Sequence, residues 1–222
     1  MAASILKKAG KYLQNLGESV LSKQLEKQEG VADKNDEFGL QRFVTAQNTW
    51  NSYDVAVKEL AAGRKRSHWI WFVLPQMRGL GHSYKSNYYG ISCGHEAEAY
   101  LAHEVLGERL RNVCAVLLEQ ADKHRSAREV LGSIDAQKTF SSLTLFDSVS
   151  PNDIFAQCLD RWFDGKRDKR TLLLYRLRLT MSNENEKKGG TVQRFAPCRQ
   201  TIWTNPLIYN HYYNFIQSLS SY

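Results

Sequence analysis

Residues that could bind an anion are concentrated between positions 64 and 83 of the sequence. Basic side chains come first, an apolar block with two tryptophans follows, and two glycines lie near the end. Glycine lets the backbone turn with its N–H groups exposed, and successive exposed N–H groups form anion-binding concavities. Ligand pockets combine apolar walls with a few polar groups. We therefore predict ligand contacts from Lys65, Trp69, Trp71, Gln76, Gly79, Gly81 and Ser83.

His68 is the residue of this segment best suited to proton transfer. The unperturbed pKa of histidine lies close to neutrality, so the side chain can act as a general acid or base near pH 7. Within a core, the same residue would hydrogen-bond a buried carbonyl, and its neighbouring tryptophans are equally typical of a core. Both interpretations, catalytic and structural, stay open because the sequence does not show whether His68 is exposed.

Lys138 and Ser142 form a second candidate pair. They are four residues apart, so on a helix they share one face. A serine beside a lysine can act as a nucleophile where burial lowers the lysine pKa. The alternative is a polar helix surface, and the G-x-S-x-G motif of hydrolases does not occur. We predict that the pair adds ligand contacts if the fold brings it to the first segment.

The sequence contains no familiar motif for a cofactor or a metal. Residues 79–84 do not form G-x-G-x-x-G, because Tyr84 occupies the third glycine position, and no G-K-[ST] follows. Cys93, His95 and His103 lack the tight spacing of zinc ligands. We therefore expect neither a cofactor nor a bound metal.

Apolar residues recur at helical spacing along most of the chain, which predicts an all-α, multihelical single domain. The clearest stripe predicts a long helix over residues 104–123, and further helices are expected near 40–47, 53–62, 96–101, 133–146 and after Ser150. The apolar runs at 69–74 and 172–179 also fit short strands. A minor strand pair between these two runs is the only β-structure that we expect.

Three regions differ in composition. Residues 1–35 predict an N-terminal arm or frayed helix, and residues 36–180 predict the helical domain. Residues 181–222 form a C-terminal tail rich in tryptophan, tyrosine and phenylalanine. Aromatic side chains normally need burial, so we expect this tail to pack on the domain or on a partner.

The bulk properties favour a cytoplasmic protein. No run of eighteen apolar residues suggests a transmembrane segment, and lysines interrupt the short apolar start, unlike a signal peptide. The four cysteines form no C-x-x-C motif, which favours free thiols in a reducing compartment. A net charge of +7 makes this a basic protein and permits binding to an anionic small molecule, nucleic acid or an acidic membrane surface.

Several separated motifs occur in the order found in one protein family. Together they resemble the domain of unknown function family 1810 over residues 38–175. The resemblance implies a compact, mainly helical fold and no established activity. Some members carry the label "calpastatin", an inhibitor of a calcium-dependent protease, but such inhibitors are disordered whereas this composition predicts a core. The motifs are Gly63–Phe72 with Pro75-Gln76 and Gly79–Ser83, Tyr100–His103 with Val105–Gly107, Lys138 with Ser141–Phe146, and Leu159–Arg161 with Phe163–Gly165.

Two functional hypotheses of different classes follow. The first is a small cytosolic protein with a pocket for an anionic small molecule, with catalysis left open. It requires Lys65, His68 and Gln76 to converge. The alternative is a non-enzymatic interaction module that binds a protein, nucleic acid or membrane surface through basic faces. It requires one convex face that carries Arg64, Lys65, Arg66, Lys166, Arg167, Lys169 and Arg170.

Overall fold

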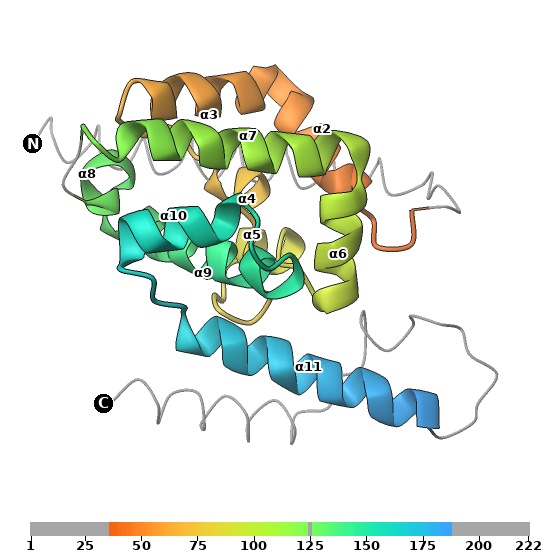
Figure 1. Cartoon of the computed structure of the whole chain (residues 1–222). Helices are drawn as coiled ribbons and strands as arrows, with labels where there is room; N and C mark the ends of the chain where they lie inside the picture. Colours follow the sequence, from red (N-terminus) through yellow and green to blue (C-terminus); the bar gives the residue numbers. More distant parts are fainter. Residues whose placement is uncertain (1–35, 124–125, 188–222) are drawn as a thin grey trace, which may run out of the picture. The chain divides into compact units, whose positions relative to one another are not determined.

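The computed structural model describes residues 36–123 and 126–187 (Figure 1). The chain divides into two units after Gly39, and the helical unit begins at Leu40. The expected N-terminal arm, residues 1–35, and the aromatic part of the expected tail lie outside the described residues.

The described residues form α-helices joined by short turns, which confirms the all-α prediction. The last helix continues to Lys187, past the domain boundary expected at residue 180. The elements are α2 (Gln41–Asn48), the 3₁₀ turn η1 (Thr49–Asn51), α3 (Ser52–Ala61), α4 (Ile70–Val73), α5 (Tyr84–Tyr88), α6 (Gly94–Ala102), α7 (Glu104–Gln120), α8 (Ala127–Leu131), α9 (Ser133–Val149), α10 (Ile154–Phe163) and α11 (Lys169–Lys187).

The predicted strand pair is wrong. The first apolar run forms the helical turn α4, and the second lies inside α11. Leu174 and Arg178 are both buried, and residues four apart share one helix face. The leucines and arginines of residues 172–179 therefore belong to a helix, and the buried face of this helix includes Arg178. Within the described residues, β-structure is limited to an isolated parallel bridge between Met77 and Ile91.

Helix α7 lies between α3 and α10, while α10 packs on α9, and α11 contacts α9 and α6 (Figure 1). The close approach of α6 and α7 depends on Gly107, where a Cβ atom would lie 2.1 Å from the carbonyl oxygen of Leu101. The predicted apolar stripe of α7 is buried as expected and consists of Leu106, Leu110, Val113, Cys114 and Leu117.

Helix α10 begins at a different residue from the one that its sequence suggests. A serine followed by proline, as at Ser150, is typical of a helix start. In the structure Asp153 is the N-cap, and its Oδ1 accepts a hydrogen bond from the backbone N–H of Ile154 at 2.7 Å. Ser150 instead donates to Oδ2 of Asp153 at 3.1 Å. The carboxylate offers a charged acceptor to the positive helix terminus, so it displaces the hydroxyl from the capping position.

His103 caps α7 through an unprotonated ring nitrogen. Its Nδ1 accepts the backbone N–H groups of Val105 at 3.2 Å and Leu106 at 3.4 Å. Loss of an N-cap acceptor costs about 1 kcal/mol, so we expect His103→Ala to lower the free energy of unfolding in urea by roughly that amount. His103→Asn, which restores a capping acceptor, should recover most of the loss. Equal stability of wild type and His103→Ala would contradict the capping role.

Two of the cysteines follow the expectation of free thiols. Cys114 and Cys158 are free and buried, and the Cys158 thiol lies 3.5 Å from the carbonyl oxygen of Cys114. In the part of the chain that the structure describes, no helix has both the length and the apolar character to cross a membrane.

Candidate functional site

The predicted ligand-binding residues separate into two groups in the structure. One group surrounds Asp135, an acidic residue in the first turn of α9 that the sequence analysis did not identify. The other group lies around the bridge between Met77 and Ile91. The first group contains Lys65, Trp69, Trp71 and Lys138, the second contains Gln76, Gly79, Gly81 and Ser83, and Ser142 belongs to neither. Gln76 therefore does not converge with Lys65 as the pocket hypothesis requires.

Two lysines share the carboxylate of Asp135. The ammonium of Lys65 lies 2.6 Å from Oδ2, and that of Lys138 lies 2.8 Å from Oδ1. The side chains of Lys65, Asp135 and Lys138 are 5%, 18% and 18% exposed. We call these three residues the Lys–Asp–Lys cluster. Two positive charges against one negative charge leave one positive charge in a mostly buried position, where solvent screens it less than at the surface.

Each ammonium group also lies over an indole ring. Lys65 Nζ is 4.8 Å from the ring centroid of Trp69, and Lys138 Nζ is 4.0 Å from that of Trp71. The negative face of an indole ring attracts a cation at such a distance. Trp69 is buried, whereas Trp71 is half-buried. Lys138 therefore keeps partial exposure beside a half-buried indole, whereas Lys65 is almost fully buried beside a buried one.

The hydrogen bonds of the cluster leave donors available. Burial disfavours the charged form of Asp135, but hydrogen bonds from Lys138 and Lys65 outweigh burial and lower its pKa. Lys65 also donates to the carbonyl of Ser67. Among the described residues, Lys138 donates only to Asp135. Because an ammonium has three N–H donors, two donors of Lys138 remain for solvent or for a ligand.

Glu59 of α3 anchors the loop that carries Lys65, and the sequence analysis did not identify it either. Its carboxylate accepts the backbone N–H groups of Arg66 at 2.8 Å and Ser67 at 3.0 Å, and the indole N–H of Trp69 at 2.8 Å. Burial raises the pKa of Glu59, but these hydrogen bonds outweigh burial, so the net effect is a lowered pKa. The anchor holds the ring of Trp69 beneath the ammonium of Lys65.

Replacing Glu59 by glutamine tests this anchor. The variant turns one acceptor oxygen into a donor that faces N–H groups, and we expect it to lower the free energy of unfolding by about 1–2 kcal/mol at pH 7. The pKa of Glu59 is lower in the folded state than in the unfolded state, where it is about 4.3. The wild type therefore keeps this stability at pH values above the unfolded-state pKa and loses it as the pH falls through the folded-state pKa. The urea stabilities of variant and wild type should therefore converge in acid. A difference that does not depend on pH would contradict the charged anchor.

His68 is exposed, which excludes the interpretation of a core histidine. It lies in the same loop as Lys65, and within the described residues no hydrogen bond involves its imidazole. Its role as a general acid or base stays a prediction. Across residues 36–123 and 126–187, no group of three or more His, Cys, Asp or Glu side chains could hold a metal ion.

The second group has clear structural roles. Ser83 caps α5, because its hydroxyl accepts the backbone N–H of Ser86 at 3.1 Å. Gly79 has a φ of 101°, which side chains rarely allow. At Gly81 a Cβ atom would lie 3.0 Å from the Cβ of Ser86. Gln76 is buried. Packing and turn geometry therefore explain the two glycines and the serine, and ligand contact by this group stays a prediction.

Ser142 and Lys138 lie one turn apart on α9, but no hydrogen bond joins their side chains within the described residues. Lys138 donates to Asp135 instead. Ser142 is fully buried, and its hydroxyl has no hydrogen-bond partner within the described residues. Activation of this serine by Lys138 therefore has no support in the hydrogen bonding.

A buried network around Glu96 of α6 was also missed from the sequence. One carboxylate oxygen pairs with Arg42 of α2, and the other accepts the backbone N–H of Ser92 at 2.8 Å. Arg178 of α11 donates to the carbonyl of Ser92 and, at 2.8 Å, to that of Arg78. Burial, together with the nearby charge of Arg78, lowers the pKa of Arg178 to about 10. This network ties α2, α6 and α11 together.

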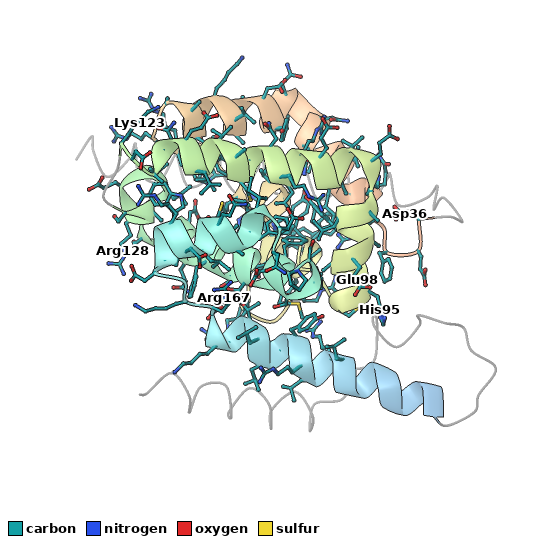
Figure 2. All side chains as sticks on the ribbon, viewed as in Figure 1. Asp36, His95, Glu98, Lys123, Arg128 and Arg167 are labelled. Carbon is teal, nitrogen blue, oxygen red and sulfur yellow. The ribbon has the colours of Figure 1, made fainter. Side chains whose placement is uncertain are left out.

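Three of the seven basic residues of the interaction hypothesis, Lys65, Lys166 and Arg167, pair with acidic neighbours. The side chain of Lys65 is buried in the Lys–Asp–Lys cluster. Arg167, in the turn between α10 and α11 (Figure 2), pairs with Asp147 at 2.9 Å, and Lys166 pairs with Asp164 at 3.1 Å. These ion pairs reduce the positive potential that a polyanion-binding face requires.

Comparisons with known proteins indicate a family but no activity. The sequence profile of the family "Protein of unknown function (DUF1810)" matches residues 37–175. A similar crystal structure is that of the conserved hypothetical protein Rv1873 from Mycobacterium tuberculosis, which is 44% identical. The similarity covers 64% of this chain and 99% of that chain, with a TM-score of 0.60. No curated protein matches the chain. The Lys–Asp–Lys cluster lies inside the matched region, whereas Arg178 lies beyond it.

Proposed function

We propose that this chain, which belongs to the DUF1810 family of proteins of unknown function, binds a small-molecule anion at the Lys–Asp–Lys cluster. The observation that carries the proposal is the sharing of one carboxylate by two ammonium groups, at 2.6 Å and 2.8 Å. The uncompensated positive charge favours an anion, and the free N–H donors of Lys138 offer it hydrogen bonds.

The surroundings of the cluster support the same function. The half-buried indole of Trp71 lies against Lys138 and offers an apolar surface to the rest of a ligand. The exposed His68 lies in the loop that carries Lys65, and we propose it as the acid–base group of any reaction on the bound ligand. The proposal includes a cytoplasmic location, which the sequence pattern predicts.

Thermal unfolding with a panel of anions at constant ionic strength tests the proposal. A ligand present at a hundredfold excess over its dissociation constant stabilises the folded state by about 2.7 kcal/mol. We expect at least one small anion to raise the melting temperature of the wild type but not of Lys138→Met, which keeps the apolar stem and loses the charge.

Lys123→Met is the matched control. Lys123 has an exposed side chain in the turn after α7 (Figure 2), outside the cluster, so its variant should respond to the anion as the wild type does. The proposal is contradicted if no anion stabilises the wild type, or if Lys138→Met is stabilised as much as the wild type.

A further inference from the structure

We infer that Asp135 determines the charge class of the ligand, so that the wild-type site binds monoanions and discriminates against dianions. This inference rests on the proposed function and specifies the ligand of the same site. The favoured ligand is a monocarboxylate with an apolar body.

The charge of the cluster favours a ligand with a single negative charge. The two lysines and Asp135 together carry one positive charge, and all three side chains are at least four-fifths buried. A monoanion brings this site to neutrality. A dianion leaves one uncompensated negative charge, and solvent cannot fully screen a charge in this position.

The geometry places that excess charge beside Asp135. Each oxygen of the Asp135 carboxylate already contacts one lysine. An incoming anion must therefore accept hydrogen bonds from the remaining N–H donors of Lys138. The anion and the Asp135 carboxylate then contact the same ammonium group. A monoanion gains more from the two ammonium groups than it loses through repulsion by Asp135. For a dianion the attraction and the repulsion both double, but the cost of removing its charge from water rises with the square of the charge, and the single net positive charge of the cluster does not offset that cost.

The apolar part of the predicted ligand follows from Trp71. Trp71 is half-buried, and its ring centroid lies 4.0 Å from the ammonium of Lys138. A ligand that places its carboxylate on Lys138 can therefore lay a hydrocarbon or aromatic group along the indole edge. Burial of that group from water adds to the affinity in proportion to its apolar area.

Two tetrahedral anions that differ in charge provide the test. Sulfate is a dianion, and methyl sulfate has the same head group with a single negative charge. Acetate and benzoate are added as carboxylates without and with an apolar body. Each is titrated at constant ionic strength into wild type, Asp135→Asn and Lys138→Met, and tryptophan fluorescence reports binding.

We expect the wild type to bind methyl sulfate and acetate at least about tenfold more tightly than sulfate, and benzoate more tightly than acetate. Asp135→Asn keeps the size of the side chain and leaves two positive charges, so its preference should reverse towards sulfate. Lys138→Met leaves no net charge and should bind none of the four anions measurably.

The outcomes separate the inference from the proposed function. If anions bind with a dependence on Lys138 but Asp135→Asn keeps the wild-type preference, the inference is wrong and the proposed function stands. If none of the four anions binds to wild type or to Asp135→Asn, the proposed function itself fails. The wild type also provides a test by itself. If it binds sulfate as tightly as it binds methyl sulfate, the inference is wrong, even if Asp135→Asn does not fold.

Discussion

Replacing Glu96 by glutamine is expected to lower the free energy of unfolding by about 3–5 kcal/mol, the typical cost of removing one partner from a buried ion pair. Glu96 is 2% exposed. Its carboxylate pairs with Arg42 and accepts hydrogen bonds from the backbone and hydroxyl of Ser92. It also attracts the buried guanidinium of Arg178. Without this negative charge, buried guanidinium groups lose a nearby counter-charge.

Glu98 provides the matched control for this prediction. It lies on the same helix, α6, but its side chain is exposed (Figure 2), and surface substitutions usually change stability by less than about 0.5 kcal/mol. Urea denaturation at pH 7 of Glu96→Gln and Glu98→Gln measures the difference. A loss of the same size in both variants would show that the pairing of Glu96 contributes nothing.

Replacing Gly107 by alanine is expected to destabilise the protein by about 3 kcal/mol, because the added methyl group has no room. A Cβ atom would lie 2.1 Å from the carbonyl oxygen and 2.9 Å from the carbonyl carbon of Leu101. Both atoms belong to the backbone, so α6 and α7 must move apart. Helix propensity alone predicts the opposite sign, since alanine is favoured over glycine inside a helix by about 1 kcal/mol.

Glu108→Ala, at the next position of α7, measures the effect of helix propensity on stability without a steric clash. Glu108 is exposed, so the change to alanine should alter the free energy of unfolding by no more than a few tenths of a kcal/mol. Both variants are compared by urea denaturation. A Gly107→Ala variant at least as stable as the wild type would contradict the close approach of α6 and α7.

Much of the helical fold could be predicted because a helix repeats its pattern locally. The stripe along α7 is visible in the sequence because each buried residue lies three or four positions from the next. The same reasoning failed at α11, where Arg178 interrupts the apolar face. An arginine at a buried position is understood only when its acceptors, the carbonyls of Arg78 and Ser92, are known.

The candidate site could be predicted only in part, for a related reason. Lys65, Trp69, Trp71 and Lys138 were expected to contact a ligand, and the structure does bring them together. Glu59 and Asp135, the two acids that contact these residues, could not be predicted. Each lies on a helix, where the sequence suggests that an acidic side chain faces solvent. Their partners belong to another segment of the chain. The sequence around an acidic residue does not show which distant N–H groups or ammonium groups it will meet.

In the proposed site, Lys138 presents its free donors to a small anion beside Trp71. The most direct measurement is a titration of ¹⁵N-labelled wild type and Lys138→Met with acetate, in which the indole N–H resonance of Trp71, assigned with Trp71→Phe, is followed at constant ionic strength. We predict a saturable shift of this resonance in the wild type and none in Lys138→Met. A resonance that does not move in the wild type, or that moves equally in both proteins, would contradict anion binding at the Lys–Asp–Lys cluster.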